Sequence, residues 1–141
     1  MGLASDLQSL KSFIGTAVFD FINIFWRRVV FYLILLFFTV LFLVPTQLLP
    51  EEQIFHWWDK AQHAAVFIVL GLFGAIAYPR NTYQIFLGLL FYGALIELLQ
   101  SLTSWRQGDV YDWYADALGI AIIWLFYGLL MRIKTNSFEK R

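Results

Sequence analysis

Residues 3–26 alternate between apolar and polar positions with the period of a helix. Leu, Ile, Ala and Phe side chains recur in steps of three or four along one side, and Ser, Thr, Asp and Asn side chains recur on the opposite side. This pattern predicts an amphipathic helix. Because Asp20 and Asn23 argue against a path across the membrane, we expect this helix to lie flat in the headgroup region and to end at Arg27 and Arg28. Packing against the rest of the protein as an ordinary helix is the alternative.

Four longer apolar stretches follow this segment. They cover residues 29 to about 49, 61–78, 82 to about 105 and 113–131. A helix of about 20 residues crosses the hydrocarbon core of a bilayer, and each stretch is close to this length. The sequence from Tyr78 to Asn81 contains a proline and predicts a tight turn, so the second and third helices should form a hairpin.

The composition also points to a membrane protein. Hydrophobic side chains make up 60% of the 141 residues and charged side chains only 14%, against about 25% charged in ordinary soluble domains. A soluble domain of this size cannot bury so much apolar surface behind so few charges. These values exclude a disordered chain, a nucleic-acid-binding protein with a basic face and most soluble enzymes. The chain has no cysteine, which excludes disulfides and thiolate metal sites.

We therefore expect an all-α membrane protein, a four-transmembrane-helix bundle with an N-terminal amphipathic interfacial helix. Residues 1–28 form the interfacial helix, residues 29–133 the four-span domain and residues 134–141 a basic cytoplasmic tail. Eight Lys and Arg residues fall on the side of the predicted bundle that holds both termini, whereas Lys60 and Arg106 fall on the other side. Positive charge marks cytoplasmic loops, so we expect a multi-pass protein of the inner, or plasma, membrane with both termini in the cytoplasm.

Ionisable side chains gather at the outer ends of three predicted spans. Within each span, polar residues three or four positions apart share one helix face: Asp59 with His63, Glu97 with Gln100, and Asp112 with Asp116. Lys60, Arg106 and Asp109 flank these pairs. Alternating spans bring the three helix ends to the same depth, where charges facing hydrocarbon are costly. We therefore predict that His63, Glu97, Arg106 and Asp116 converge on one polar pocket that opens outward.

The same residues carry a resemblance to a known family. The ordered pattern is Asp59-Lys60-x-x-His63, then Glu97-x-x-Gln100, then Arg106-x-x-Asp109-x-x-Asp112-x-x-Ala115-Asp116-x-x-Gly119. It resembles the VanZ-like family, which is named for a protein linked to teicoplanin resistance, over about residues 30–131. The chain departs from the family pattern at Asp116, where Asn is usual, and at Ser104-Trp105, where Pro-Gly is usual. The resemblance implies a membrane fold and a role in antibiotic tolerance or envelope maintenance, without defining a reaction.

The first interpretation of the cluster is a site that binds or modifies a membrane lipid or a lipid-linked cell-wall molecule. Lys60 and Arg106 would hold a phosphate or carboxylate, with Asp59, Gln100 and Asp109 as further ligand-binding candidates. The catalytic candidates are His63, Glu97, Asp112 and Asp116. The carboxylates would act as acid or base, and His63 would transfer a proton or attack phosphorus. Whether any reaction is catalysed is left open, and no cofactor is identified.

Two other interpretations stay open. In one, the polar side chains satisfy one another and lock the helices, and the protein is a scaffold for a membrane partner. In the other, His63, Glu97, Asp112 and Asp116 ligate a divalent cation, because oxygen-rich ligand sets suit Mg²⁺, Ca²⁺ or Mn²⁺. Five carboxylates near two cationic side chains leave an excess of negative charge, which either shared protons or a bound cation would compensate.

Overall fold

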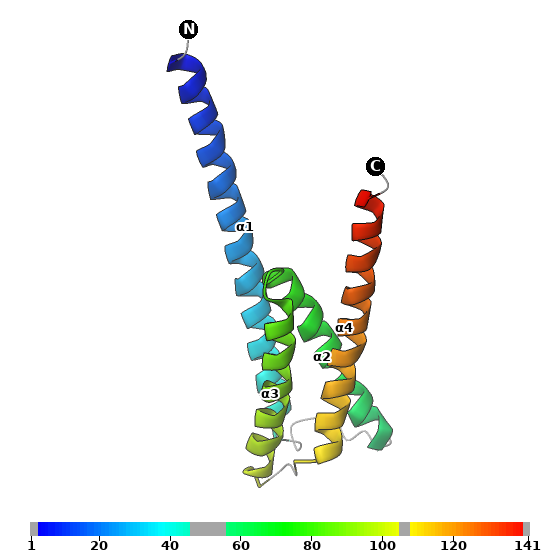
Figure 1. The fold of residues 1–141 in the computed structure, drawn as a ribbon. Helices are drawn as coiled ribbons and strands as arrows, with labels where there is room; N and C mark the ends of the chain where they lie inside the picture. Colours follow the sequence, from blue (N-terminus) through cyan, green and yellow to red (C-terminus); the bar gives the residue numbers. More distant parts are fainter. Residues whose placement is uncertain (1–2, 46–55, 105–107, 140–141) are drawn as a thin grey trace.

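The structure is a computed structural model that describes residues 3–45, 56–104 and 108–139. It contains four helices in chain order, and no strand occurs in these described ranges. The helices are α1 (Leu3–Leu43), α2 (His56–Ala77), α3 (Thr82–Ser101) and α4 (Val110–Glu139) (Figure 1). The protein is therefore all-α, as the sequence predicts.

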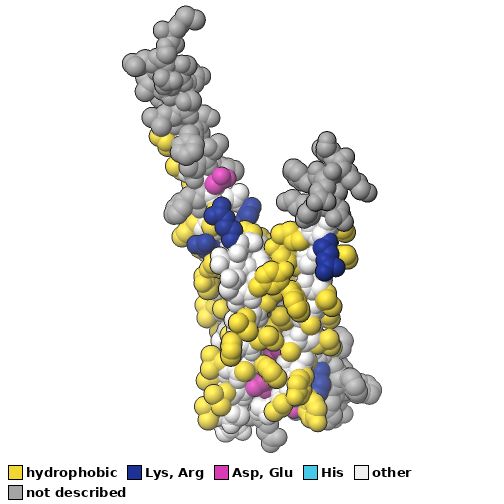
Figure 2. Space-filling view, in the orientation of Figure 1, with side chains coloured by type: hydrophobic (Ala, Val, Ile, Leu, Met, Phe, Trp, Pro, Cys, Tyr) yellow, Lys and Arg dark blue, Asp and Glu magenta, His cyan; other side chains and the backbone are white. Residues whose placement is uncertain are grey.

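Each helix contains a segment that is long and apolar enough to cross a membrane. These segments are Ile22–Leu43, Asp59–Ala77, Thr82–Ser101 and Val110–Ile133, with lengths of 22, 19, 20 and 24 residues. Large apolar side chains cover the outside of the bundle, and Phe91 and Leu125 are each 70% exposed (Figure 2). An apolar exterior of this kind is stable in lipid and not in water. The length and composition of the four helices thus confirm the prediction of a helical membrane protein with four spans.

The first helix differs from the sequence prediction. The expected end at Arg27 and Arg28 is absent, because α1 continues without a break to Leu43. No Gly or Pro lies between residues 16 and 44, and Arg is a good helix former, so nothing ends the helix at the arginine pair. The helix instead ends two residues before Pro45, as expected because proline disfavours helical geometry in the preceding residue.

Helix α2 is the centre of the bundle and packs against each of the other three helices, most extensively against α4. Glycines allow the close approach of α2 and α4. A Cβ atom at Gly119 would overlap the backbone of Ala64, and one at Gly71 would lie 2.6 Å from Ile123 Cγ2. Small residues drive helix association in membranes because they let the backbones come close together.

The hydrophobic core lies between the four helices. It is built mainly from large aromatic and aliphatic side chains: Phe42, Phe67, Leu70, Phe86, Leu89, Ile96, Ile120 and Ile123. Both termini lie at one end of the bundle together with the turn between α2 and α3, and we call this the termini end (Figure 1). The end of α1, the start of α2, the end of α3 and the start of α4 meet at the opposite end, which we call the cluster end.

The orientation of the bundle is testable with single cysteines, since the chain has none. Ser104 at the cluster end and Asn81 at the termini end are both exposed. We expect Ser104→Cys to react with a membrane-impermeant maleimide in intact cells, because the basic termini end should stay in the cytoplasm. Asn81→Cys should react only after the membrane is opened. The reverse pattern would place the termini outside.

The glycine contact between α2 and α4 predicts a stability difference between two similar substitutions. Gly119→Ala forces a Cβ against the Ala64 backbone, and overpacking of this kind costs about 1–3 kcal/mol. Gly88→Ala is the matched control, because nothing lies within 4 Å of a Cβ at that position. It should leave the unfolding free energy unchanged or raise it by up to about 1 kcal/mol. Unfolding in detergent measures both, and equal effects would disprove the close contact.

Candidate functional site

A buried ionisable side chain from each of three helices meets the other two at the cluster end. His63 lies near the start of α2, Glu97 near the end of α3 and Asp116 near the start of α4. A nitrogen of His63 and a carboxylate oxygen of each acid all lie within 4.8 Å of one another. Because α2 and α4 begin at the end of the bundle where α3 finishes, the three side chains reach the same depth. The predicted convergence of these three residues is present.

The contacts within this group are short and shielded from solvent. His63 Nδ1 lies 2.9 Å from Asp116 Oδ1 and 3.9 Å from Glu97 Oε1. His63 is 1% exposed, Asp116 0% and Glu97 9%. The backbone N–H of Asp109 donates a hydrogen bond of 2.8 Å to Glu97 Oε2. The His63–Asp116 contact therefore joins α2 to α4, and the Glu97–Asp109 bond joins α3 to the residue that precedes α4.

Two carboxylate oxygens of this group have no hydrogen-bond partner among the residues that the structure describes. They are Glu97 Oε1 and Asp116 Oδ2, and both are fully shielded from solvent. Buried polar atoms are almost always paired, and an unpaired one costs about 1–3 kcal/mol. Two carboxylates so close together in an apolar bundle also repel each other when both are ionised. The geometry therefore calls for positive charge between them, which His63, a shared proton or a bound cation would supply.

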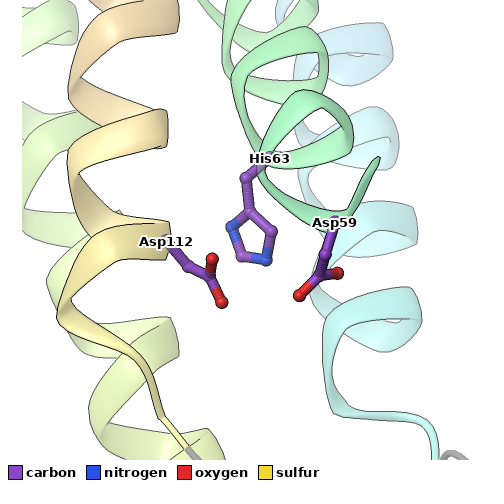
Figure 3. Close-up of side chains that lie close together, drawn as sticks. All are labelled: Asp59, His63 and Asp112. Atoms are coloured by element: carbon purple, nitrogen blue, oxygen red, sulfur yellow. The ribbon is translucent and has the colours of Figure 1, made fainter. Parts of the chain in front are cut away.

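A second layer of charge lies nearer the end of the bundle. Lys60 Nζ is 3.0 Å from Asp109 Oδ2 and 2.8 Å from Asp112 Oδ1, so this lysine links α2 to the start of α4. Figure 3 shows the His63 ring between the carboxylates of Asp59 and Asp112. These two acids and His63 form a second group whose ligand atoms lie within 4.8 Å of one another. Asp59 is exposed, so the cluster extends from the surface to the buried Asp116.

Asp109 also has a local structural role. Its Oδ1 accepts a hydrogen bond of 2.9 Å from the backbone N–H of Tyr111. This is the contact expected of an aspartate that precedes the first residue of a helix and caps its free N–H groups. A Cβ at Gly108 would overlap the backbone of Glu97. Glycine at that position thus lets the start of α4 come close enough for Asp109 to reach α3.

One predicted site residue, Gln100, stands apart from the group. Gln100 is buried, but its Nε2 donates a hydrogen bond of 2.9 Å to the backbone oxygen of Phe42. That contact ties α3 to the end of α1, where the last carbonyls have no partner within the helix. The side-chain N–H of Gln100 is therefore engaged in a contact between α3 and α1. Arg106 lies outside the described residues, so its predicted place in the pocket stays a prediction.

The sequence pattern does not identify Phe42, which forms one wall of the site. Phe42 is buried and its ring stacks on His63, with centroids 4.7 Å apart and an interplanar angle of 34°. Among the many Phe residues of the first span, only its position near the helix end distinguishes it. Gly93 forms another wall, because a Cβ there would lie 2.7 Å from Asp116 Oδ2. Phe42 thus covers the His63 ring, and Gly93 lets α3 lie close against Asp116 Oδ2.

Comparisons with protein-family models, with curated proteins and with solved structures give no match to this chain. The resemblance to the VanZ-like family thus depends on the spaced polar residues alone. Six of those residues take part in the contacts within the cluster: Lys60, His63, Glu97, Asp109, Asp112 and Asp116. Any functional assignment must therefore be argued from the geometry of the cluster.

The His63–Asp116 contact predicts a non-additive pair of substitutions. His63→Leu leaves a buried carboxylate without its partner, and breaking a buried pair costs about 3–5 kcal/mol. The double variant His63→Leu/Asp116→Leu removes both polar groups, so it should recover much of that loss. Unfolding in detergent of both single variants and the double variant gives the coupling energy. Additive losses would show that the two side chains do not stabilise each other.

Proposed function

We propose that this chain is a VanZ-like membrane protein whose polar cluster binds or modifies a lipid-linked or cell-envelope molecule. The role of such binding would be antibiotic tolerance or maintenance of the envelope. One observation carries the proposal: Glu97 and Asp116 are buried beside His63, and each has one carboxylate oxygen without a hydrogen bond from any described residue. Buried titratable groups that converge in this way are typical of functional sites. They are costly in a purely structural bundle.

The depth of the cluster favours an amphiphilic ligand. Glu97 lies four positions before the end of α3 and Asp116 six positions after the start of α4. At 1.5 Å per residue, these offsets are about 6 Å and 9 Å from the helix ends. The bilayer headgroup layer is about 5–8 Å thick on each side. A molecule with its tail in the bilayer would present its polar head at this depth without crossing the membrane.

The described side chains divide into a holding group and a reacting group. Lys60 is positioned by Asp109 and Asp112 at the outer layer and would contact a phosphate or carboxylate of the ligand, together with Arg106. His63 is held through Nδ1 by Asp116, while no hydrogen bond to its Nε2 occurs within the described part of the chain. If the bound molecule reacts, that nitrogen is the natural proton carrier of the site.

A divalent cation would resolve the charge imbalance of the cluster. Five carboxylates lie near one described lysine: Asp59, Glu97, Asp109, Asp112 and Asp116. His63, Glu97 and Asp116 offer one nitrogen and two oxygen ligands within 4.8 Å of one another. Mixed nitrogen and oxygen sets suit Mn²⁺ or Zn²⁺. A cation held there would also attract the phosphate of an envelope lipid to an otherwise negative site.

The second candidate function is a scaffold, and a specific observation favours it. Polar contacts at the cluster end connect all four helices: Gln100 with Phe42, Glu97 with Asp109, Lys60 with Asp112 and His63 with Asp116. Such a network locks the helix ends without any ligand. In that case the site residues would matter only for folding and for presenting a surface to a membrane partner.

We also propose an inner, or plasma, membrane location with both termini in the cytoplasm. The excess of Lys and Arg at the termini end supports this orientation. The part of α1 before Ile22 is proposed to lie in the membrane interface, a position that would require α1, unbroken from Leu3 to Leu43, to bend near the membrane surface. Its polar stripe supports this position, and Ile14 and Val18 are each 51% exposed. Those apolar side chains need a covering surface, which the headgroup region provides.

The variant Glu97→Gln distinguishes the two proposed functions, a ligand-binding site and a scaffold. The amide keeps the size of the side chain and an oxygen for the Asp109 N–H, but it removes one charge. We expect the variant to accumulate and unfold like the unaltered protein, yet to lose its function. The measurement is the survival of a deletion strain, complemented with each variant, under a glycopeptide that binds cell-wall precursors. Protein abundance is followed by immunoblot.

Gln100→Leu is the matched control, because it removes only the bond to the Phe42 carbonyl. It should lower stability and abundance together with any function. If survival tracks abundance for both variants, the scaffold is the correct function.

The same proteins test whether the cluster binds a divalent cation. After chelation, Mn²⁺ or Zn²⁺ should raise the unfolding temperature of the unaltered protein and of Gln100→Leu, but not of Glu97→Gln. If neither metal raises the unfolding temperature of the unaltered protein, the cluster does not bind the cation. The survival of the complemented strains then tests lipid binding alone.

A further inference from the structure

A polar cavity lies at the termini end, far from the cluster. Its volume is about 330 Å³, and it lies between α1 and the turn that joins α2 to α3. The polar lining residues come from these two segments: Asp20, Asn23, Arg27 and Arg28 from α1, and Tyr78, Arg80 and Asn81 from the turn. The cavity shares no residue with the cluster and takes no part in the function proposed above.

The lining of this cavity is strongly positive. Three arginines, Arg27, Arg28 and Arg80, face a single acid, Asp20. Within the described residues, none of these arginines has a carboxylate within 4.0 Å. Figure 2 shows the basic side chains gathered where α1 passes the α2–α3 turn, with one acidic side chain beside them. The charge of the cavity is therefore not neutralised from within the described chain.

Arg28 is held in place by an aromatic contact. Its guanidinium carbon lies 4.7 Å from the centre of the Tyr78 ring, within the range of a cation–π interaction. The Tyr78 hydroxyl is hydrogen-bonded to the Tyr32 hydroxyl at 2.9 Å. That bond raises the pKa of Tyr78 above its ordinary value, so the phenol stays neutral. An arginine fixed in one plane loses little entropy when it binds a phosphate or carboxylate.

The position of Arg80 strengthens the need for an anion. It lies just before the start of α3 at Thr82, where the helix dipole places partial positive charge. Asn81 makes no side-chain hydrogen bond that would cap the free N–H groups of that helix. A cation beside an uncapped helix N-terminus is unfavourable unless an anion lies between them. Helix N-termini bind phosphate for the same reason.

We propose that this cavity binds the phosphate of an anionic phospholipid headgroup from the leaflet at the termini end. Phosphate groups match the guanidinium geometry of the arginines. Two features favour a lipid over a soluble phosphate compound. The cavity lies at the start of the first span, Ile22–Leu43, and its apolar lining residue Ile24 is followed by exposed Phe25 and Trp26. The cavity wall thus continues into a lipid-facing surface on which acyl chains would lie.

The test compares short-chain lipids as ligands of the purified protein in a zwitterionic detergent. Dihexanoyl phosphatidylglycerol should raise the unfolding temperature in a saturable way, and dihexanoyl phosphatidylcholine should not. Glycerol phosphate, which has the same anionic group without acyl chains, should give a much smaller shift. An equal shift with glycerol phosphate would mean that the cavity takes a soluble phosphate compound. No shift with phosphatidylglycerol would overturn the proposal without any variant being needed.

Substitutions distinguish lipid binding in the cavity from attraction of the lipid by the general positive charge of the termini end. Arg28→Gln and Arg80→Gln should each weaken the apparent affinity for phosphatidylglycerol about tenfold, because each removes a charge-assisted hydrogen bond. Arg132→Gln is the matched control, since Arg132 is an exposed arginine on α4 that does not line the cavity. It should leave the affinity within about twofold. An equal loss in all three variants would show that only surface charge attracts the lipid.

Discussion

The cost of placing charged groups inside an apolar helical bundle governs this structure. His63 and Asp116 lie fully buried between α2 and α4, joined at 2.9 Å. In hydrocarbon or in a dry core, such groups are stable only when they face one another. The glycine contacts of α2 with α4 bring the helices close enough for this pair to form. The other polar groups of the cluster end, from Glu97 to Lys60, are arranged around it.

The bundle carries opposite charge at its two ends. Carboxylates dominate the cluster end, and Asp59 and Asp112 lie in the first turns of α2 and α4, where the helix dipole favours acids. Arginines dominate the termini end, where Arg80 lies beside a helix N-terminus that disfavours cations. The core between the ends is apolar, so neither end can neutralise the other. Each end therefore attracts its own counter-charge, cations at one and anions at the other.

Several departures from the sequence predictions have one cause. Helical periodicity identifies which residues share a face, but not which neighbour that face meets. Gln100 shares a face with Glu97, yet it bonds to the Phe42 carbonyl because the end of α1 packs there. Phe42 belongs to an apolar span in which nothing marks it as a site residue, yet it covers His63. The absence of a break at Arg27 and Arg28 follows from local propensity, which outweighs the change in amphipathic pattern at that point.

The sequence by itself determined the class of fold. Sixty per cent hydrophobic residues, four stretches of spanning length and the Tyr78–Asn81 turn leave only a helical membrane bundle, because backbone groups in lipid must bond within their own helix. It also determined that His63, Glu97 and Asp116 reach one depth, since alternating spans fix the level of each helix end. Only the tertiary structure decided which oxygens are paired, which are left unpaired, and that three arginines line a cavity at the termini end. Those features depend on helix rotation and side-chain packing, which the spacing of residues along a chain does not specify.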